Sequence, residues 1–158
     1  MDLTTIEETA VTLLKNKGYR ISTAESCTGG LLAATIINVA GASDVIDVGF
    51  VTYANEAKMK YLGVSDETLK EHGAVSVECA REMALGVTKQ MGADVGLSTT
   101  GIAGPDGGTA DKPVGLVYVG CCIRGEVEVT ELRLSGSRKE IREETVTRAL
   151  EILCRRLK

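Results

Sequence analysis

Residues 23–32, with the sequence TAESCTGGLL, limit most strongly what this chain can fold into. They follow a short β-like run and lead into an apolar run over residues 31–39 that has the character of a helix. Gly29 and Gly30 allow the backbone to turn tightly between the two runs and to approach a ligand closely. The segment therefore predicts a strand, a tight turn and a helix whose first N–H groups are free to bind an anion.

Hydroxyl and thiol side chains stand at this turn, on Ser26, Cys27 and Thr28. A nucleophile beside free backbone N–H groups is the arrangement that acyl transfer requires. In that interpretation the oxyanion donors come from the backbone of Cys27, Thr28, Gly29 and Gly30. The alternative is structural, with Thr28 capping a buried helix and the glycines only turning the chain. This stretch alone leaves both interpretations open.

The remaining segments alternate between helical and strand-like patterns. Apolar residues at helical spacing predict helices over residues 3–17, 76–91 and 137–157, with shorter helices at 55–62 and after Ser65. β-Branched runs predict strands over residues 20–24, 45–54, 93–100, 115–123 and 126–134. This order predicts the α/β class, with one domain over residues 1–158 and a mixed sheet covered by helices on both faces.

Side-chain patterns also predict which faces are buried. The helix over residues 76–91 should bury Ala80, Met83, Ala84, Val87 and Met91, and the last helix Ile141, Thr145, Ala149 and Ile152. In the last strand the apolar alternation changes phase between Val129 and Leu132. This change predicts a β-bulge near residues 130–131.

The composition argues against several classes of function. The net charge is −4 and no long Lys/Arg run occurs, which argues against binding to nucleic acid or to an anionic membrane. Aromatic residues make up only 3% of the chain, without Trp, so stacking of bases is not expected. Because no apolar run approaches ~18 residues and the start lacks signal-peptide regions, we expect a cytoplasmic protein.

Five cysteines without a Cys-x-x-Cys pair predict buried, reduced thiols rather than disulfides or a metal site. His72 is the only histidine, so a His-rich zinc site cannot form. Its place before Gly73 at a helix end favours a structural role, in which it pairs with free carbonyl groups.

Three loops follow predicted strands, at residues 26–30, 53–58 and 100–108. Ligands of open α/β sheets bind beyond the carboxyl ends of parallel strands, so these loops can meet at one site. A serine nucleophile needs a base, and Lys58 is a better candidate than His72, because a lysine in a dry pocket can lose its proton near neutral pH. Tyr53 could relay or hold the proton between Ser26 and Lys58. The structural alternatives are a solvated Lys58 and a Tyr53 that packs at the strand end.

The loop over residues 101–108 can offer consecutive N–H groups to an anion. It matches neither the Walker A nor the dinucleotide-binding spacing, and the Gly-x-Ser-x-Gly and Ser-x-x-Lys motifs are absent from the chain. Arg138 and Arg142 lie one helical turn apart at the start of the last helix. They could clamp a phosphate or carboxylate, although a solvated helix face explains them as well.

Five ordered motifs, read together, closely resemble the CinA C-terminal-domain family, which contains the bacterial nicotinamide-nucleotide amidases. They are TAESCTGG (residues 23–30), VTYANEAK (51–58), HGAVS (72–76), TGIAGPDGG (100–108) and KPVG (112–115). The resemblance covers essentially the whole chain. It implies a three-layer α/β/α sandwich around a mixed, five-stranded sheet. The implied reaction converts nicotinamide mononucleotide to nicotinate mononucleotide and ammonia, without a metal or a cofactor.

The resemblance also implies roles for individual residues. By position, Ser26 matches the nucleophile, Lys58 the base and Tyr53 an assisting hydroxyl. The positions expected to contact the nucleotide are Asn55, Thr100, Gly101, Ile102, Ala103 and Gly104. Arg138 matches a substrate-binding arginine, with Arg142 as the alternative.

Two positions depart from the family pattern. Ala54 stands where many relatives have Ser, and Gly136-Ser137-Arg138 replaces the commoner Gly-Asp-Arg. The sequence as a whole predicts a serine amidohydrolase in the stand-alone form without the family's N-terminal partner domain, and a homo-oligomer, with a dimer as the expected state. The alternatives are a nucleotide-binding or regulatory module without turnover and an enzyme that uses Cys27 as its nucleophile.

Overall fold

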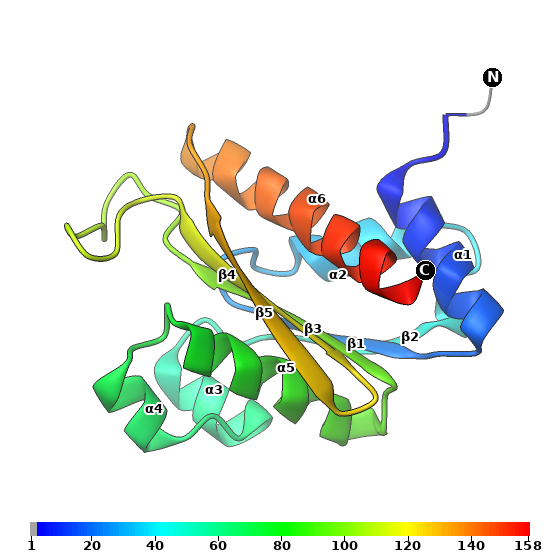
Figure 1. Ribbon diagram of the computed structural model, residues 1–158, viewed down its shortest axis with the longest axis horizontal. Helices are drawn as coiled ribbons and strands as arrows, with labels where there is room; N and C mark the ends of the chain where they lie inside the picture. Colours follow the sequence, from blue (N-terminus) through cyan, green and yellow to red (C-terminus); the bar gives the residue numbers. More distant parts are fainter. Residues whose placement is uncertain (1–2) are drawn as a thin grey trace.

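A five-stranded sheet in the order β2–β1–β3–β4–β5 separates two layers of helices in the computed structural model, which describes residues 3–158 (Figure 1). The strands are β1 (Ile21–Glu25), β2 (Ile46–Val51), β3 (Val95–Gly101), β4 (Leu116–Ile123) and β5 (Glu126–Arg133). β1 pairs in parallel with β2 and β3, β3 pairs antiparallel with β4, and β4 antiparallel with β5. The predicted α/β class and mixed sheet are confirmed.

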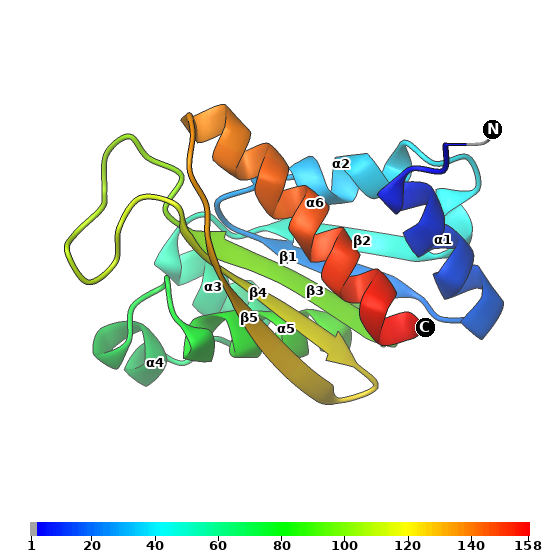
Figure 2. The ribbon, with the colours of Figure 1, turned by 45° about the horizontal axis from the view of Figure 1, so that its top comes forward.

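Helices cover both faces of the sheet (Figure 2). One layer holds α1 (Ile6–Lys17), α2 (Leu31–Ile37) and α6 (Arg138–Leu157), and the other holds α3 (Asn55–Leu62), α4 (Asp66–Glu71) and α5 (Val77–Met91). A short 3-10 helix, Ala42–Asp44, precedes β2. Among the residues that the structure describes, no helix combines the length and apolar character needed to cross a membrane.

The predicted buried faces agree with the structure except at one position. In α5, Ala80, Met83, Ala84 and Val87 are buried, and in α6 the four predicted residues are buried as well. Met91 is 59% exposed. The last turn of α5, which ends at Gly92, presents this side chain to solvent.

The predicted β-bulge in β5 is wrong. The pairing of β5 with β4 is continuous from Ile123 opposite Glu126 to Leu116 opposite Arg133. The apolar residues change phase because helices cover both faces of the sheet. Val129 and Leu132 are three residues apart and therefore point to opposite faces. Leu132 packs in the hydrophobic core that contains residues of α6, and Val129 lies opposite Gly120, whose backbone approaches Ala80 of α5.

A glycine on α5 allows α3 to pack closely against that helix. A Cβ at Gly86 would lie 1.7 Å from the carbonyl oxygen of Leu62, the last residue of α3. This close approach matters for the site, because α3 carries the buried Lys58.

We expect Gly86→Ala to lower the free energy of unfolding by about 1–3 kcal/mol, because a backbone oxygen cannot move aside as a flexible side chain can. Alanine would favour the helix by only ~1 kcal/mol, so the clash determines the sign. Chemical denaturation of the variant measures the effect. Gln90→Ala, at an exposed position of the same helix, is the control and should change stability little. Equal or higher stability of Gly86→Ala would contradict the role of this contact.

Candidate active site

The carboxyl ends of β2, β1 and β3 lie side by side, so the three loops predicted to meet do come together at this edge of the sheet. The loop that carries Ser26 follows β1, which lies between β2 and β3, so it stands between the loops that follow those two strands. Ser26 is 9% exposed, and its N–H donates to the carbonyl of Thr99 at 3.0 Å. The backbone of the proposed nucleophile is therefore fixed to the neighbouring strand.

Lys58 reaches Ser26 from the second turn of α3. Its side chain is 1% exposed, and its Nζ lies 3.0 Å from Ser26 Oγ. The same Nζ contacts the carbonyl oxygens of Thr52 at 2.7 Å and Tyr53 at 3.2 Å. The alternative of a solvated lysine is therefore wrong.

Burial lowers the pKa of Lys58, because a charged amine loses its hydration in this position. A neutral amine has two N–H donors and one lone pair. The two carbonyl groups can only accept hydrogen bonds, so they take both donors and leave the lone pair for the Ser26 hydroxyl proton. This set of partners suits a general base.

The N-terminus of α2 is not free to bind an anion, which corrects the prediction for this helix. The buried Glu25 carboxylate accepts hydrogen bonds from the N–H groups of Gly30, Leu32 and Ala33 at 2.8–3.2 Å. It also accepts from the Thr28 hydroxyl at 2.5 Å. Glu25 is not among the residues predicted for the site, although a carboxylate shortly before a helix is a known N-terminal partner of such N–H groups.

Only part of the predicted oxyanion donor set remains available. The Gly29 N–H donates to the carbonyl of Ser26 at 3.1 Å, and the Gly30 N–H is held by Glu25. Within residues 3–158, the N–H groups of Cys27 and Thr28 have no acceptor. Thr28 is fully buried, whereas Cys27 is 7% exposed, so the Cys27 N–H is the donor beside Ser26 that a ligand could reach.

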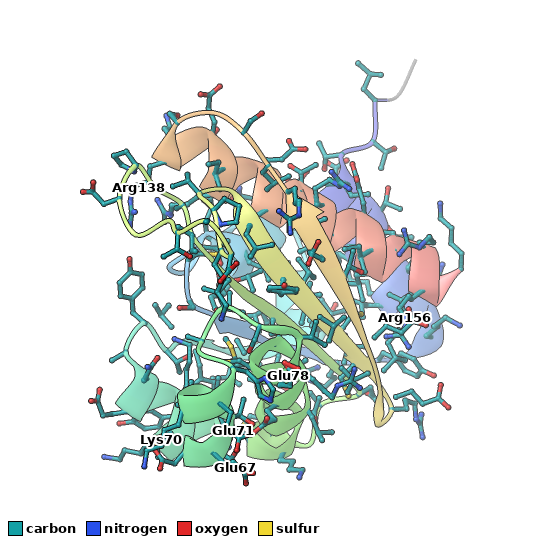
Figure 3. All side chains as sticks on the ribbon, turned by 60° about the vertical axis from the view of Figure 1, so that its left-hand side comes forward. Glu67, Lys70, Glu71, Glu78, Arg138 and Arg156 are labelled. Carbon is teal, nitrogen blue, oxygen red and sulfur yellow. The ribbon has the colours of Figure 1, made fainter. Side chains whose placement is uncertain are left out.

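The two arginines at the start of α6 have different partners. Arg142 donates from Nε to the Cys27 carbonyl and from Nη2 to the Thr28 carbonyl, both at 2.9 Å. Arg138 donates from Nη1 to the Gly104 carbonyl at 2.8 Å and from Nη2 to the Tyr53 hydroxyl at 3.0 Å. Figure 3 shows Arg138 at the start of α6, beside the loop that follows β3. Arg142 therefore holds the backbone of the Ser26 loop, and Arg138 links the two outer loops.

The hydroxyl of Tyr53 does not lie between Ser26 and Lys58. The side chain is 62% exposed, and its hydroxyl contacts Arg138 instead. The predicted relay of a proton through this hydroxyl is therefore not supported by its position. The contact of Tyr53 with Lys58 is made by its backbone carbonyl.

The positions expected to contact the nucleotide differ in what they can still bind. The Thr100 hydroxyl donates to the Ala74 carbonyl, and the Ile102 N–H to the Leu116 carbonyl, so both groups are already used. Gly101 pairs with Val117 in the sheet. In the described part of the chain the N–H groups of Ala103 and Gly104 have no acceptor, and Asn55 is exposed at the start of α3. These last three positions could contact a ligand.

Cys27 is poorly suited to act as the nucleophile. Its side chain is 7% exposed within the larger hydrophobic core, and burial raises the pKa of its thiol to about 12. The thiol therefore stays protonated and unreactive near neutral pH. All five cysteines are buried and unpaired, as predicted.

His72 contacts carboxylates rather than the candidate site. Its ring nitrogens lie 3.7 Å from Glu78 and 3.9 Å from Glu71. Within residues 3–158, no group of three or more His, Cys, Asp or Glu side chains is arranged to hold a metal ion.

Comparison with known proteins gives one consistent family. The model of the CinA C-terminal domain matches residues 3–157. The putative competence-damage inducible protein of Clostridium novyi (strain NT) is 56% identical over 97% of this chain and 37% of that protein. The CinA-like protein of Dictyoglomus turgidum is 55% identical over 98% of this chain and 38% of that protein. The chain thus spans less than two fifths of the length of these relatives.

Solved structures agree in fold over nearly the whole chain. A CinA superfamily protein from Klebsiella pneumoniae superposes with a TM-score of 0.93 at 37% identity, covering 96% of this chain and 95% of that chain. The competence/damage inducible protein CihA from Agrobacterium tumefaciens gives 0.90 at 48% identity, covering 97% of both chains. Together with the family model, these similarities show that the chain belongs to the CinA C-terminal domain family.

Proposed function

We propose that this protein is a serine amidohydrolase that converts nicotinamide mononucleotide to nicotinate mononucleotide and ammonia. The observation that carries the proposal is the buried Lys58 Nζ at 3.0 Å from Ser26 Oγ, with two backbone carbonyl groups as its other partners. A serine becomes an effective nucleophile when an adjacent base removes its proton. The choice of substrate rests on the resemblance of the motifs to nicotinamide-nucleotide amidases.

The reaction begins when neutral Lys58 accepts the Ser26 hydroxyl proton and Ser26 Oγ forms a bond to the amide carbon. The N–H group of Cys27 stabilises the oxyanion that develops on the amide oxygen. The Lys58 ammonium group then gives its proton to the amide nitrogen, and the carbon–nitrogen bond breaks to release ammonia. Lys58, neutral again, activates a water molecule that hydrolyses the Ser26 ester and frees the carboxylate.

Arg138 is the proposed contact for the substrate phosphate. Its two terminal nitrogens already contact the Tyr53 hydroxyl and the Gly104 carbonyl, and a guanidinium group has five donors in total. The free N–H groups of Ala103 and Gly104 lie on the same loop and can add donors to an anion.

We expect purified protein to release ammonia from nicotinamide mononucleotide faster than from nicotinamide, nicotinamide riboside or glutamine. Ser26→Ala should lower kcat by ~10³-fold or more while nucleotide binding remains. Cys27→Ala should keep most of the activity, since its thiol stays protonated. An inactive Cys27→Ala beside an active Ser26→Ala would reverse the assignment of the nucleophile. Nucleotide binding without ammonia release under any condition would favour a binding module.

Lys58→Arg should be nearly as inactive as Lys58→Ala, because arginine keeps the positive charge but cannot release a proton near neutral pH. The matched control is Lys60→Arg, at an exposed position on the same helix, which should leave kcat unchanged. A Lys58→Arg rate above about one tenth of wild type, a difference of roughly 1.4 kcal/mol in the barrier, would contradict the role of a base.

The pH dependence of kcat/KM gives an independent measurement of the same group. Only neutral Lys58 accepts a proton, so kcat/KM should rise with pH through the pKa of Lys58 and then level off. Because burial lowers this pKa, the ascending limb should lie at lower pH than an exposed lysine would give.

Tyr53→Phe should raise the KM for the nucleotide about 2–10-fold with little change in kcat, because its hydroxyl accepts a hydrogen bond from Arg138 and does not contact Lys58 or Ser26. The same substitution should have no further effect in an Arg138→Ala background. Arg138→Ala should itself narrow the difference in kcat/KM between nucleotide and riboside. If Tyr53→Phe lowers kcat by ~100-fold, and does so in the Arg138→Ala background as well, the Tyr53 hydroxyl takes part in the proton transfer.

A further inference from the structure

The two edges of the sheet carry very different side chains. β2 forms one edge and β5 the other (Figure 2). β5 has charged residues at four of its eight positions, Glu126, Glu128, Glu131 and Arg133. β2, with the sequence IDVGFV, has only Asp47, and Arg20 neutralises this carboxylate by binding it. Because charged side chains on an edge strand discourage pairing with another strand, β5 is protected from such pairing and β2 is not.

The backbone of β2 is open to solvent along its outer side. The N–H of Thr52 donates to the Glu25 carbonyl of β1 at 2.8 Å. Backbone groups of successive residues in a strand point to opposite sides, so those of Gly49 and Val51 point away from β1. Both residues are exposed, and within the described part of the chain only β1 pairs with β2. A Cβ at Gly49 would lie 3.1 Å from the Cβ of Ala33 in α2, so the exposed surface of Gly49 is its backbone at the edge.

Apolar side chains surround this edge on both faces of the sheet. Among residues 3–158, five of the eight exposed large hydrophobic side chains belong to β2, the loop after it, α2 or α3: Val51, Tyr53, Ile37, Met59 and Tyr61. The ring of Tyr61 lies 6.2 Å from that of Phe50, which places α3 beside the edge. An exposed apolar region that adjoins an open strand edge is typical of an interaction surface.

The regular part of the edge is symmetric about Phe50. The register of β2 with β1 shifts by one residue at Asp47 and is continuous after it. The regular edge therefore covers residues 48–52, with Phe50 at its centre. The outward backbone groups belong to Gly49 and Val51, one residue to either side of Phe50.

We propose that two copies of this chain pair through β2 in antiparallel orientation, around a two-fold axis beside Phe50. Gly49 of each copy then lies opposite Val51 of the other copy, and the two residues exchange both of their backbone hydrogen bonds. Phe50 lies opposite Phe50 of the second copy, in a pair whose Cβ atoms approach to ~5 Å. Phe50 and Tyr61 of both copies thus form an aromatic contact across the axis. The edge is complementary to itself, as a two-fold interface requires.

The charges on β2 are compatible with this pairing. Asp47 is already bound by Arg20, and in this register it would face Tyr53 of the second copy, so that no carboxylate faces another. The same pairing through β5 would bring the glutamates of both copies together, which is destabilising. The interface does not use Ser26 or Lys58, so the inference holds whether or not the protein is an amidase.

Sedimentation over a range of protein concentrations tests the proposal on wild type, Val51→Lys and Val127→Lys. Wild type should reach twice the chain mass of 16.7 kDa. Val51→Lys should raise the Kd of the dimer by ~10–100-fold, because it brings two ammonium groups into the interface. Val127→Lys, the same change on the opposite edge strand, should leave this Kd unchanged. A monomeric wild type, or a dimer that Val51→Lys weakens no more than Val127→Lys does, contradicts the proposal.

Hydrogen exchange of individual amides locates the interface even where a variant fails to fold, which melting temperatures reveal. In the wild-type dimer, the N–H groups of Gly49 and Val51 should exchange ~100-fold more slowly than after dilution to monomers, because only pairing gives them acceptors. The N–H of Phe50 points to β1 and should be protected in both states, which makes it the internal control. Fast exchange of Gly49 and Val51 in a dimeric protein would place the interface elsewhere and overturn the proposal.

Discussion

The hydrogen bonds of the buried Lys58 amine connect the parts of the molecule on which the candidate site depends. They join α3 to the serine after β1 and to two carbonyl groups after β2. None of these partners carries a negative charge, and the loss of hydration of a charged amine is the largest influence on the pKa of Lys58, which it lowers. The surroundings therefore favour the neutral form, and the same packing that buries the side chain prepares it to accept a proton.

The Ser26 loop is held between two charges that do not pair with each other. Glu25 binds N–H groups of the loop and of α2, and Arg142 binds carbonyl groups of the turn. Each charge is satisfied largely by peptide dipoles, which have fixed directions once the backbone is set. Because the two side chains use most of the donors and acceptors in the turn and Thr28 is fully buried, the Cys27 N–H is the donor of this turn that, within residues 3–158, is left for a ligand.

The sequence predicts the secondary structure and the pairing of Ser26 with Lys58 because both depend on short-range patterns. Apolar spacing and turn residues define the elements, and the order of strands then brings the loops to one edge of the sheet. The directions of individual polar groups could not be predicted in this way. Glu25 and Arg142 bind backbone groups whose positions are set only after the turn has formed. The Tyr53 hydroxyl contacts Arg138, which lies 85 residues away in the sequence. The phase change in β5 is ambiguous in sequence, since a bulge and a strand covered on both faces give the same pattern.

The two hydrophobic cores differ in size, and the proposed base and nucleophile lie next to residues of different ones. The smaller core lies beneath α3 and α5, whereas Cys27, next to the serine, packs into the larger one. Segments with fewer buried contacts open at a lower free energy than the whole molecule. Detachment of α3 would carry the amine away from the hydroxyl while the sheet and the serine turn stay folded. This partial, reversible opening would separate Lys58 from Ser26 at a temperature below that of global unfolding, while most of the native structure stays intact.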